Sequence, residues 1–103
     1  MPRPRKLRRC RAYLGDRVFK PRSVPLRELA TIRLELSELE ALRRCDLEGL
    51  DQAEAGRRMG LSRGTVQRLL AGGRAKVVRA LVESSALLIA EEAGYEDLHS
   101  DDR

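Results

Sequence analysis

Residues 52–69 read QAEAGRRMGLSRGTVQRL, and this stretch decides the fold. The small residues Ala55 and Gly56 allow two short helices to approach each other closely, as a steep crossing requires. Asp51 and Glu54 give a start signal for the first of these helices, and Gly60, which can adopt the positive φ of a tight turn, ends it. Ser62 is a favourable N-cap for the helix that follows. Together, at this spacing, these residues predict a helix-turn-helix.

The first turns of the second helix in this motif present polar side chains outward, while Val66 and Leu69 face inward. In the major groove of DNA, an arginine side chain can donate two hydrogen bonds to guanine, and a glutamine side chain can pair with adenine. Serine and threonine hydroxyl groups can donate hydrogen bonds to phosphate oxygens. A solvated helical hairpin would explain a polar face alone, but not the whole pattern of small residue, turn and cap. We expect Arg63, Gln67 and Arg68 to read bases and Ser62 and Thr65 to hold phosphates.

Elements on both sides of the motif complete a small domain. Strict alternation of apolar and polar residues over 31–36 predicts a half-buried strand. Ser37 and Glu40 have the spacing of a capping box, which predicts a first helix that starts there and ends at Gly49. The apolar run 86–90 is too short for a stable helix, so we expect it to pair with the first strand in a two-stranded sheet.

The last helix carries two adjacent glycines, Gly72 and Gly73. The apolar phase continues across them, which predicts one long helix from Ser62 to about Glu83, bent or frayed at the glycines. A break at this point is the alternative, because two interior glycines cost about 2 kcal/mol relative to alanine.

Charge divides the 103-residue chain into three parts within one small domain. Residues 1–27 contain ten lysines and arginines, one acid and all four prolines, whereas residues 91–103 contain six acids and one arginine. We expect a basic, irregular arm over 1–27, a helix-turn-helix domain over 28–90, and an acidic, flexible tail over 91–103.

The prolines of the arm favour an extended conformation that suits contacts with DNA. Pro2 and Pro4 alternate with arginines and keep the chain extended. Extended, arginine-rich arms beside a helix-turn-helix enter the minor groove or follow phosphates, although a charge run can also be only solvated. We expect DNA contacts from the arm through Arg3, Arg5, Lys6, Arg8 and Arg9.

Several other classes of protein are disfavoured. Aromatic residues make up 3% of the chain, too few for the stacking platforms of RNA-binding sheets. Two distant cysteines do not make a disulfide scaffold, and the single histidine, His99, supports neither a metal site nor a nucleophile. We expect no cofactor, no metal and no enzymatic activity. No apolar run is long enough to span a membrane and the N-terminus has no signal core, so we expect a cytoplasmic protein.

Short stretches outside the motif resemble one family. They are MPRPR at 1–5, FKP at 19–21, PL at 25–26, ELEALR at 38–43, DLEGL at 46–50 and ALV at 80–82. In this order the chain resembles the uncharacterised protein family 0251, also called domain-of-unknown-function family 134, from Met1 to about Tyr95. The resemblance implies a small prokaryotic protein with a helix-turn-helix similar to the promoter-reading domain of sigma factors.

The chain departs from the pattern of that family in two places. Gly56 stands where a second alanine is usual, which would loosen the packing of the motif slightly. AGGR at 71–74 stands where a better helix former and Ala-Arg are usual, which would make the last helix less rigid.

We therefore expect a mainly α fold with three helices, a short two-stranded sheet, a basic arm and a flexible acidic tail. The expected function is sequence-specific binding of double-stranded DNA in transcriptional regulation. A homodimer would double the weak binding of one motif, with the C-terminal half of the last helix or the exposed part of the sheet as its surface. Two alternatives stay open: an RNA- or ribosome-associated basic protein, and a sigma-domain-like adaptor that contacts the transcription machinery.

Overall fold

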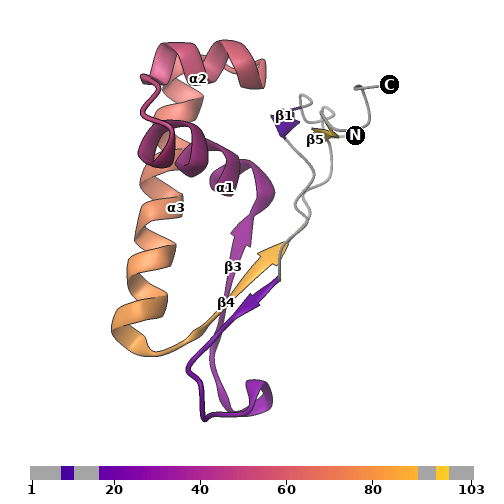
Figure 1. Cartoon of the computed structure of the whole chain (residues 1–103), viewed down its shortest axis with the longest axis vertical. Helices are drawn as coiled ribbons and strands as arrows, with labels where there is room; N and C mark the ends of the chain where they lie inside the picture. Colours follow the sequence, from indigo (N-terminus) through magenta and orange to yellow (C-terminus); the bar gives the residue numbers. More distant parts are fainter. Residues whose placement is uncertain (1–7, 11–16, 91–94, 98–103) are drawn as a thin grey trace, which may run out of the picture.

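The computed structural model of the chain describes residues 8–10, 17–90 and 95–97. A long helix runs along one side of the molecule, two shorter helices gather at one of its ends, and a small sheet lies beside the other end (Figure 1). The elements are β1 (Arg8–Cys10), β2 (Val18–Phe19), the 3-10 turn η1 (Leu26–Glu28), β3 (Thr31–Glu35), α1 (Leu36–Leu42), the π turn η2 (Arg43–Leu47), α2 (Gln52–Met59), α3 (Arg63–Glu83), β4 (Ala86–Ala90) and β5 (Tyr95–Asp97). The fold is mainly α with three α-helices in this described part, as expected.

The main sheet has one strand more than expected. β4 lies in its centre, parallel to β3 on one side and antiparallel to β2 on the other. Leu34 of β3 pairs with Ile89 of β4, and both side chains are buried. The predicted pairing of the 31–36 and 86–90 segments is therefore confirmed for residues 31–35, whereas Leu36 is the first residue of α1. The third strand is Val18–Phe19, which is too short to give an alternating pattern of its own.

A second, two-stranded sheet joins β1 and β5 in parallel, with Arg9 opposite Glu96 and Cys10 opposite Asp97. Part of the basic arm is thus paired with part of the acidic tail. We expected a flexible tail, and its residues Tyr95–Asp97 form a strand. The expectation for residues 91–94 and 98–103 lies outside the described residues.

The first helix begins earlier than the capping pattern at Ser37 and Glu40 predicted. Its N-cap is Glu35, whose side chain accepts from the backbone of Glu38, while Glu38 Oε1 accepts from the Glu35 amide at 2.9 Å. Ser37 and Glu40 are buried within the helix. The prediction was wrong because β3 runs directly into α1, so that the last strand residue is also the cap. The left-handed end at Gly49, with φ of 81°, is as expected.

The remaining helix ends follow the predicted pattern. Asp51 caps α2 by accepting from the Glu54 amide at 2.8 Å, and Gly60 ends that helix with φ of 70°. Ser62 caps α3 by accepting from the Thr65 amide at 3.2 Å. Each of these side chains satisfies a backbone amide that the helix itself leaves unpaired.

The long helix α3 continues through its two glycines, which confirms the prediction of one element. A Cβ atom on Gly73 would lie 3.1 Å from Leu42 Cδ1, and one on Gly72 would lie 2.9 Å from Glu38 Oε2. The two glycines therefore let α3 approach α1 closely. The loss of helix propensity at this point is offset by packing between the two helices.

The core beneath the helix-turn-helix is small and aliphatic. It consists of Ala41, Ala55, Met59, Val66 and Leu70, all buried, with Leu42, Cys45, Leu61 and Leu69 packed around them. The inward positions predicted within residues 52–69 are therefore correct, and this core fixes the second helix of the motif on the rest of the domain.

Candidate nucleic-acid interface

The turn between α2 and α3 is tightly packed at Gly56. A Cβ atom on Gly56 would lie 2.6 Å from the carbonyl oxygen of Leu61, and the Leu61 amide donates to the Gly56 carbonyl at 2.8 Å. A contact of 2.6 Å is shorter than atoms tolerate, so the expectation of looser packing at this position was wrong. The glycine brings the backbone of the turn against α2, and it fixes the angle at which α3 leaves the motif.

The first turns of α3 present one exposed face. Arg63, Gly64, Gln67 and Arg68 are all exposed, and at 100° per residue they lie on the same side of the helix. Among the described residues, the side chains of Arg63 and Gln67 make no hydrogen bond or ion pair. Two of the three predicted base-reading side chains, Arg63 and Gln67, are therefore available to a ligand.

The predicted phosphate-holding hydroxyls form a short chain of hydrogen bonds with Arg68. Ser62 Oγ lies 2.9 Å from Thr65 Oγ1, and Arg68 Nη2 donates to Thr65 Oγ1 at 3.2 Å. Ser62 is exposed, whereas Thr65 is half-buried. The chain holds the Arg68 guanidinium along the helix surface, and Thr65 acts in it as a support for Arg68.

Arg63 also faces the start of α2. It lines an open hollow of about 470 Å³ together with Asp51, Gln52 and Ala53. The N-terminal ends of the two helices of the motif therefore border the same hollow.

Two cations on α2 were not singled out from the sequence. Arg57 and Arg58 are exposed, and both form ion pairs with Glu54, with Arg58 Nε 2.8 Å from Glu54 Oε2. In helix-turn-helix proteins the first helix crosses the DNA backbone, so exposed arginines on it are candidates for phosphate contacts. Arg57 and Arg58 follow Glu54 by three and four residues, which is the spacing of ion pairs on a helix surface. The sequence alone could therefore have indicated these two contacts.

The unpaired positive charge of α3 is concentrated at its N-terminal end. Further along the helix, Arg74 binds Asp46 at 2.7 and 2.9 Å, and Lys76 binds Glu38 at 2.7 Å. Within the described part of the chain, Arg63 and Arg68 have no acidic partner. The hydrogen bond from Arg74 holds the pKa of Asp46 below its ordinary value, so this carboxylate stays charged and keeps Arg74 occupied.

The arm is described only in part. Arg3, Arg5 and Lys6 lie outside the described residues. Arg8 and Arg9 belong to β1, which lies beside α1 and α2 and is drawn at the same end of the molecule as the helix-turn-helix (Figure 1).

Other kinds of site find no support in the described residues. They contain no group of three metal-ligating side chains and no helix able to cross a membrane. Cys45 is half-buried and packs against the core, and burial raises the pKa of its thiol.

The fold and this exposed helix face define a small helix-turn-helix domain. The chain belongs to the family described as "Protein of unknown function DUF134", whose model matches residues 1–98. This confirms the resemblance noted from the sequence. No solved structure matches the chain.

Three curated relatives named as UPF0251 proteins are similar to the chain. The relative from Halothermothrix orenii is 47% identical over 87 residues, which cover 84% of this chain and 64% of the relative. The relative from Rhodospirillum rubrum is 48% identical over 89 residues, covering 86% of this chain and 62% of the relative. A relative from Shewanella sediminis is 46% identical over 92 residues, covering 89% of this chain and 96% of the relative. The chain thus spans somewhat less than two thirds of the first two relatives.

Proposed function

We propose that this chain binds double-stranded DNA at specific sequences through α2 and α3, and that it regulates transcription by doing so. The observation that carries the proposal is the exposed face of Arg63, Gln67 and Arg68 on the first turns of the second helix of the motif. These side chains stand where helix-turn-helix proteins contact base edges, and their donor groups match guanine and adenine.

The mechanism is docking without chemistry. The N-terminal turns of α3 enter the major groove, where Gln67 pairs with a base and Arg63 and Arg68 contact bases or phosphates. Arg57 and Arg58 of α2 lie over the backbone of the duplex. The buried core and the close contact at Gly56 keep the two helices at a fixed angle, so little ordering is required on binding.

Electrostatics support the same surface. The chain has a net charge of +5, and several arginines and lysines away from the motif are neutralised by acidic partners. The cations on the first turns of α3 have none among the described residues. A nucleic acid is therefore attracted to the end of the molecule that carries the reading face.

A direct test compares binding of the full chain to a mixed-sequence duplex and to a structured RNA of equal length at the same salt concentration. We expect the duplex to bind more tightly, with an affinity that falls as salt rises. Equal or tighter binding to the RNA would favour an RNA-associated basic protein, and no binding to either would contradict the proposal.

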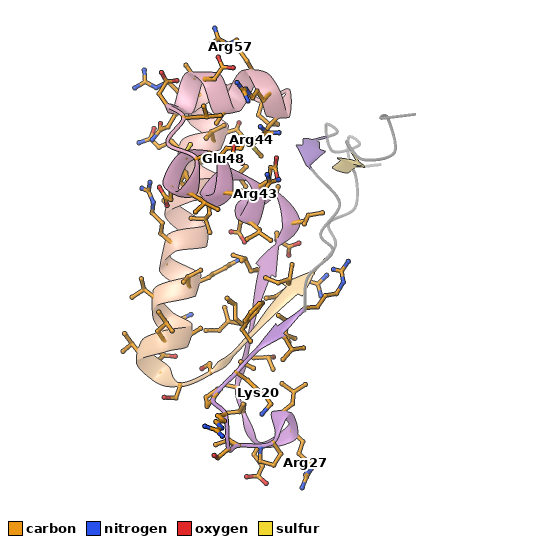
Figure 2. All side chains as sticks on the ribbon, in the orientation of Figure 1. Lys20, Arg27, Arg43, Arg44, Glu48 and Arg57 are labelled. Atoms are coloured by element: carbon orange, nitrogen blue, oxygen red, sulfur yellow. The ribbon has the colours of Figure 1, made fainter. Side chains whose placement is uncertain are left out.

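Two arginine variants make the test specific to the motif. Arg63→Gln and Arg27→Gln each remove one exposed positive charge, but Arg27 lies at the opposite end of the molecule from the helix-turn-helix (Figure 2). We expect Arg63→Gln to weaken duplex binding at least tenfold and Arg27→Gln to weaken it less than twofold. Equal losses would mean that only net charge attracts DNA.

A further inference from the structure

Gly64 is an exposed glycine in the first turn of α3, on the face that carries the predicted base-reading side chains. Around the helix axis it lies about 40° from Arg68 and about 60° from Gln67, at 100° per residue. A Cβ atom on Gly64 would lie 3.8 Å from Arg68 Nη1. The guanidinium of Arg68 therefore folds back along the helix, beside the space that a side chain at residue 64 would occupy.

The same guanidinium is held by Thr65. Arg68 Nη2 donates to Thr65 Oγ1 at 3.2 Å, and Thr65 Oγ1 lies 2.9 Å from Ser62 Oγ. A threonine hydroxyl can accept from one group and donate to another, so Thr65 can accept from Arg68 and donate to Ser62 at the same time. Because a branched Cβ atom also restricts the side chain of a threonine in a helix, Thr65 is a stiff support for Arg68.

Arg63 and Arg68 share the exposed face but differ in this support. Among the described residues, the side chain of Arg63 makes no hydrogen bond or ion pair, whereas that of Arg68 is anchored. A free arginine loses rotamer entropy when it binds at one place, and an anchored one has lost part of it beforehand. The contact with Thr65 uses one of the five N–H donors of Arg68, which leaves enough for the two acceptors of guanine.

We propose that Thr65 and Gly64 are positioning residues that prepare Arg68 to read a guanine at one fixed place in the target site. Thr65 supplies the acceptor that holds the guanidinium, and Gly64 supplies the room beside it. This inference rests on the proposed function and deepens it, because it commits Arg68 to a base and Thr65 to Arg68 instead of a phosphate.

NMR relaxation of the Arg68 Nε–H group in the full chain without DNA tests the positioning by itself. We expect this group to be more ordered than the same group of Arg63. Thr65→Val keeps the shape of the residue and the backbone amide that Ser62 caps, but it removes the acceptor, so Arg68 should become as mobile as Arg63. Thr65→Ser keeps the hydroxyl and should preserve the order of Arg68. Equal mobility of the two arginines in the wild-type chain would overturn the proposal.

Two substitutions of Gly64 test the room beside Arg68 in the same measurement. The 3.8 Å distance is an ordinary van der Waals contact, so Gly64→Ala should leave Arg68 ordered. Gly64→Leu places a longer side chain in that space and should release the guanidinium. Alanine and leucine are both good helix formers, so neither variant weakens the helix itself. An Arg68 side chain that stays ordered in Gly64→Leu would overturn the role of Gly64.

Selection of bound sequences from a random duplex pool, followed by titration of the preferred site, tests the reading role. We expect Thr65→Val to bind that site about three- to tenfold more weakly, because Arg68 must now be ordered on binding. Its affinity for a random-sequence duplex should stay the same, and it should lose preference at the guanine that Arg68→Ala also loses.

The two variants separate this inference from the proposed function. If Arg68→Ala loses the guanine while Thr65→Val keeps the consensus and the affinity of the wild-type chain, the positioning role of Thr65 is wrong and the reading role of α3 stands. If Arg68→Ala keeps the whole consensus, the reading of a base by Arg68 in the proposed function is itself contradicted.

Discussion

At the scale of single residues, the glycines of the helix-turn-helix have different structural roles at different positions. Gly56 is in close contact with the backbone of Leu61, whereas a Cβ atom on Gly64 would meet nothing nearer than Arg68 Nη1 at 3.8 Å. The sequence shows both as small residues in a helix-turn-helix. Only the path of the backbone separates a glycine that is required from one that is merely tolerated.

Alanine at these two glycines should therefore change stability in opposite directions. Gly64→Ala should raise the free energy of unfolding by about 0.5 kcal/mol, since alanine loses less backbone entropy in a helix. Gly56→Ala should lower it by about 1–3 kcal/mol, because the turn must move to accept the methyl group. Urea unfolding of the two variants measures both changes. A Gly56→Ala variant that is more stable than the wild-type chain would contradict this account. It would show that the turn can accept a Cβ atom at residue 56 although that atom would lie 2.6 Å from the Leu61 carbonyl oxygen.

The Asp46–Arg74 pair predicts a pH dependence at acid pH. Hydrogen bonding to Arg74 lowers the pKa of Asp46 below its ordinary value of 3.8. A carboxyl group with a lowered pKa stabilises the fold above its unfolded pKa, and this contribution is lost as the pH falls through the folded value. Unfolding midpoints of the wild-type chain and Asp46→Asn should differ above about pH 5 and converge in more acid solution. A difference that persists in acid would exclude this pair as its source.

At the scale of elements, the sequence contains two overlapping capping patterns at the start of α1. Ser37 with Glu40 and Glu35 with Glu38 have the same three-residue spacing, and the second pair is the one that caps. Local sequence cannot decide between them, because both satisfy the amides of a first turn. Tertiary burial decides, since Leu36 and Ser37 are enclosed by the domain.

The other caps of the motif, at Asp51, Gly60 and Ser62, were predictable because no competing pattern lies beside them. The predicted reading residues of α3 were likewise found on one exposed face. Strand β2 was not predicted as part of the sheet, since two residues carry no periodicity. The exposure of Leu81 and Val82 near the end of α3 could not be predicted, because it depends on where the sheet lies.

A buried ion pair explains the position of Glu40 within α1. Arg44 Nε lies 2.7 Å from Glu40 Oε2, both side chains are almost fully buried, and Arg43 contacts the same carboxylate. The pair connects α1 to η2. Removing one member would leave a charge without its main partner away from water, which costs more than the pair itself contributes.

Arg44→Met should therefore destabilise the fold by about 3–5 kcal/mol, because Glu40 would lose its buried partner. Calorimetric or urea unfolding measures the loss. The double variant Glu40→Leu with Arg44→Met should recover most of it, since two packed apolar side chains carry no uncompensated charge. A single variant that unfolds like the wild-type chain would show that the carboxylate is reached by water.

At the scale of the whole molecule, opposite charges at the two ends of the chain come together. The arm and the tail meet in the pairing of β1 with β5, which places Arg9 opposite Glu96. In the proposed DNA binding, the acidic residues of the tail would compete with phosphates for the cations of the arm, because the two segments carry opposite charge. The proposed affinity for nucleic acid would then depend on both ends of the chain.

Truncation after Tyr95 should tighten non-specific binding to duplex DNA at low salt, because it removes four acids from the tail. The gain should shrink as salt screens the charges. Fluorescence titration of one random-sequence duplex at several salt concentrations measures the effect. Unchanged affinity at low salt would leave the tail without a role in binding, whatever its pairing with β1.

In the proposed function, α3 reads base sequence while the arm contributes affinity without specificity. These contributions can be separated, because phosphate contacts set the salt dependence and base contacts set the discrimination. Removing residues 1–11 should weaken binding to all duplexes alike and reduce the salt slope. Gln67→Ala should keep the slope and cost about 1–3 kcal/mol at a preferred site.

Selection of bound sequences from a random duplex pool tests this claim most directly, with the wild-type chain and Gln67→Ala run in parallel. Val66→Asp, which places a charge in the buried core, is the unfolded control. We predict an enriched consensus for the wild-type chain and a loss of preference at one or two of its base pairs for Gln67→Ala. No enrichment, or an identical consensus from a folded Gln67→Ala and a folded Arg68→Ala, would contradict the assignment of α3 as the reading helix.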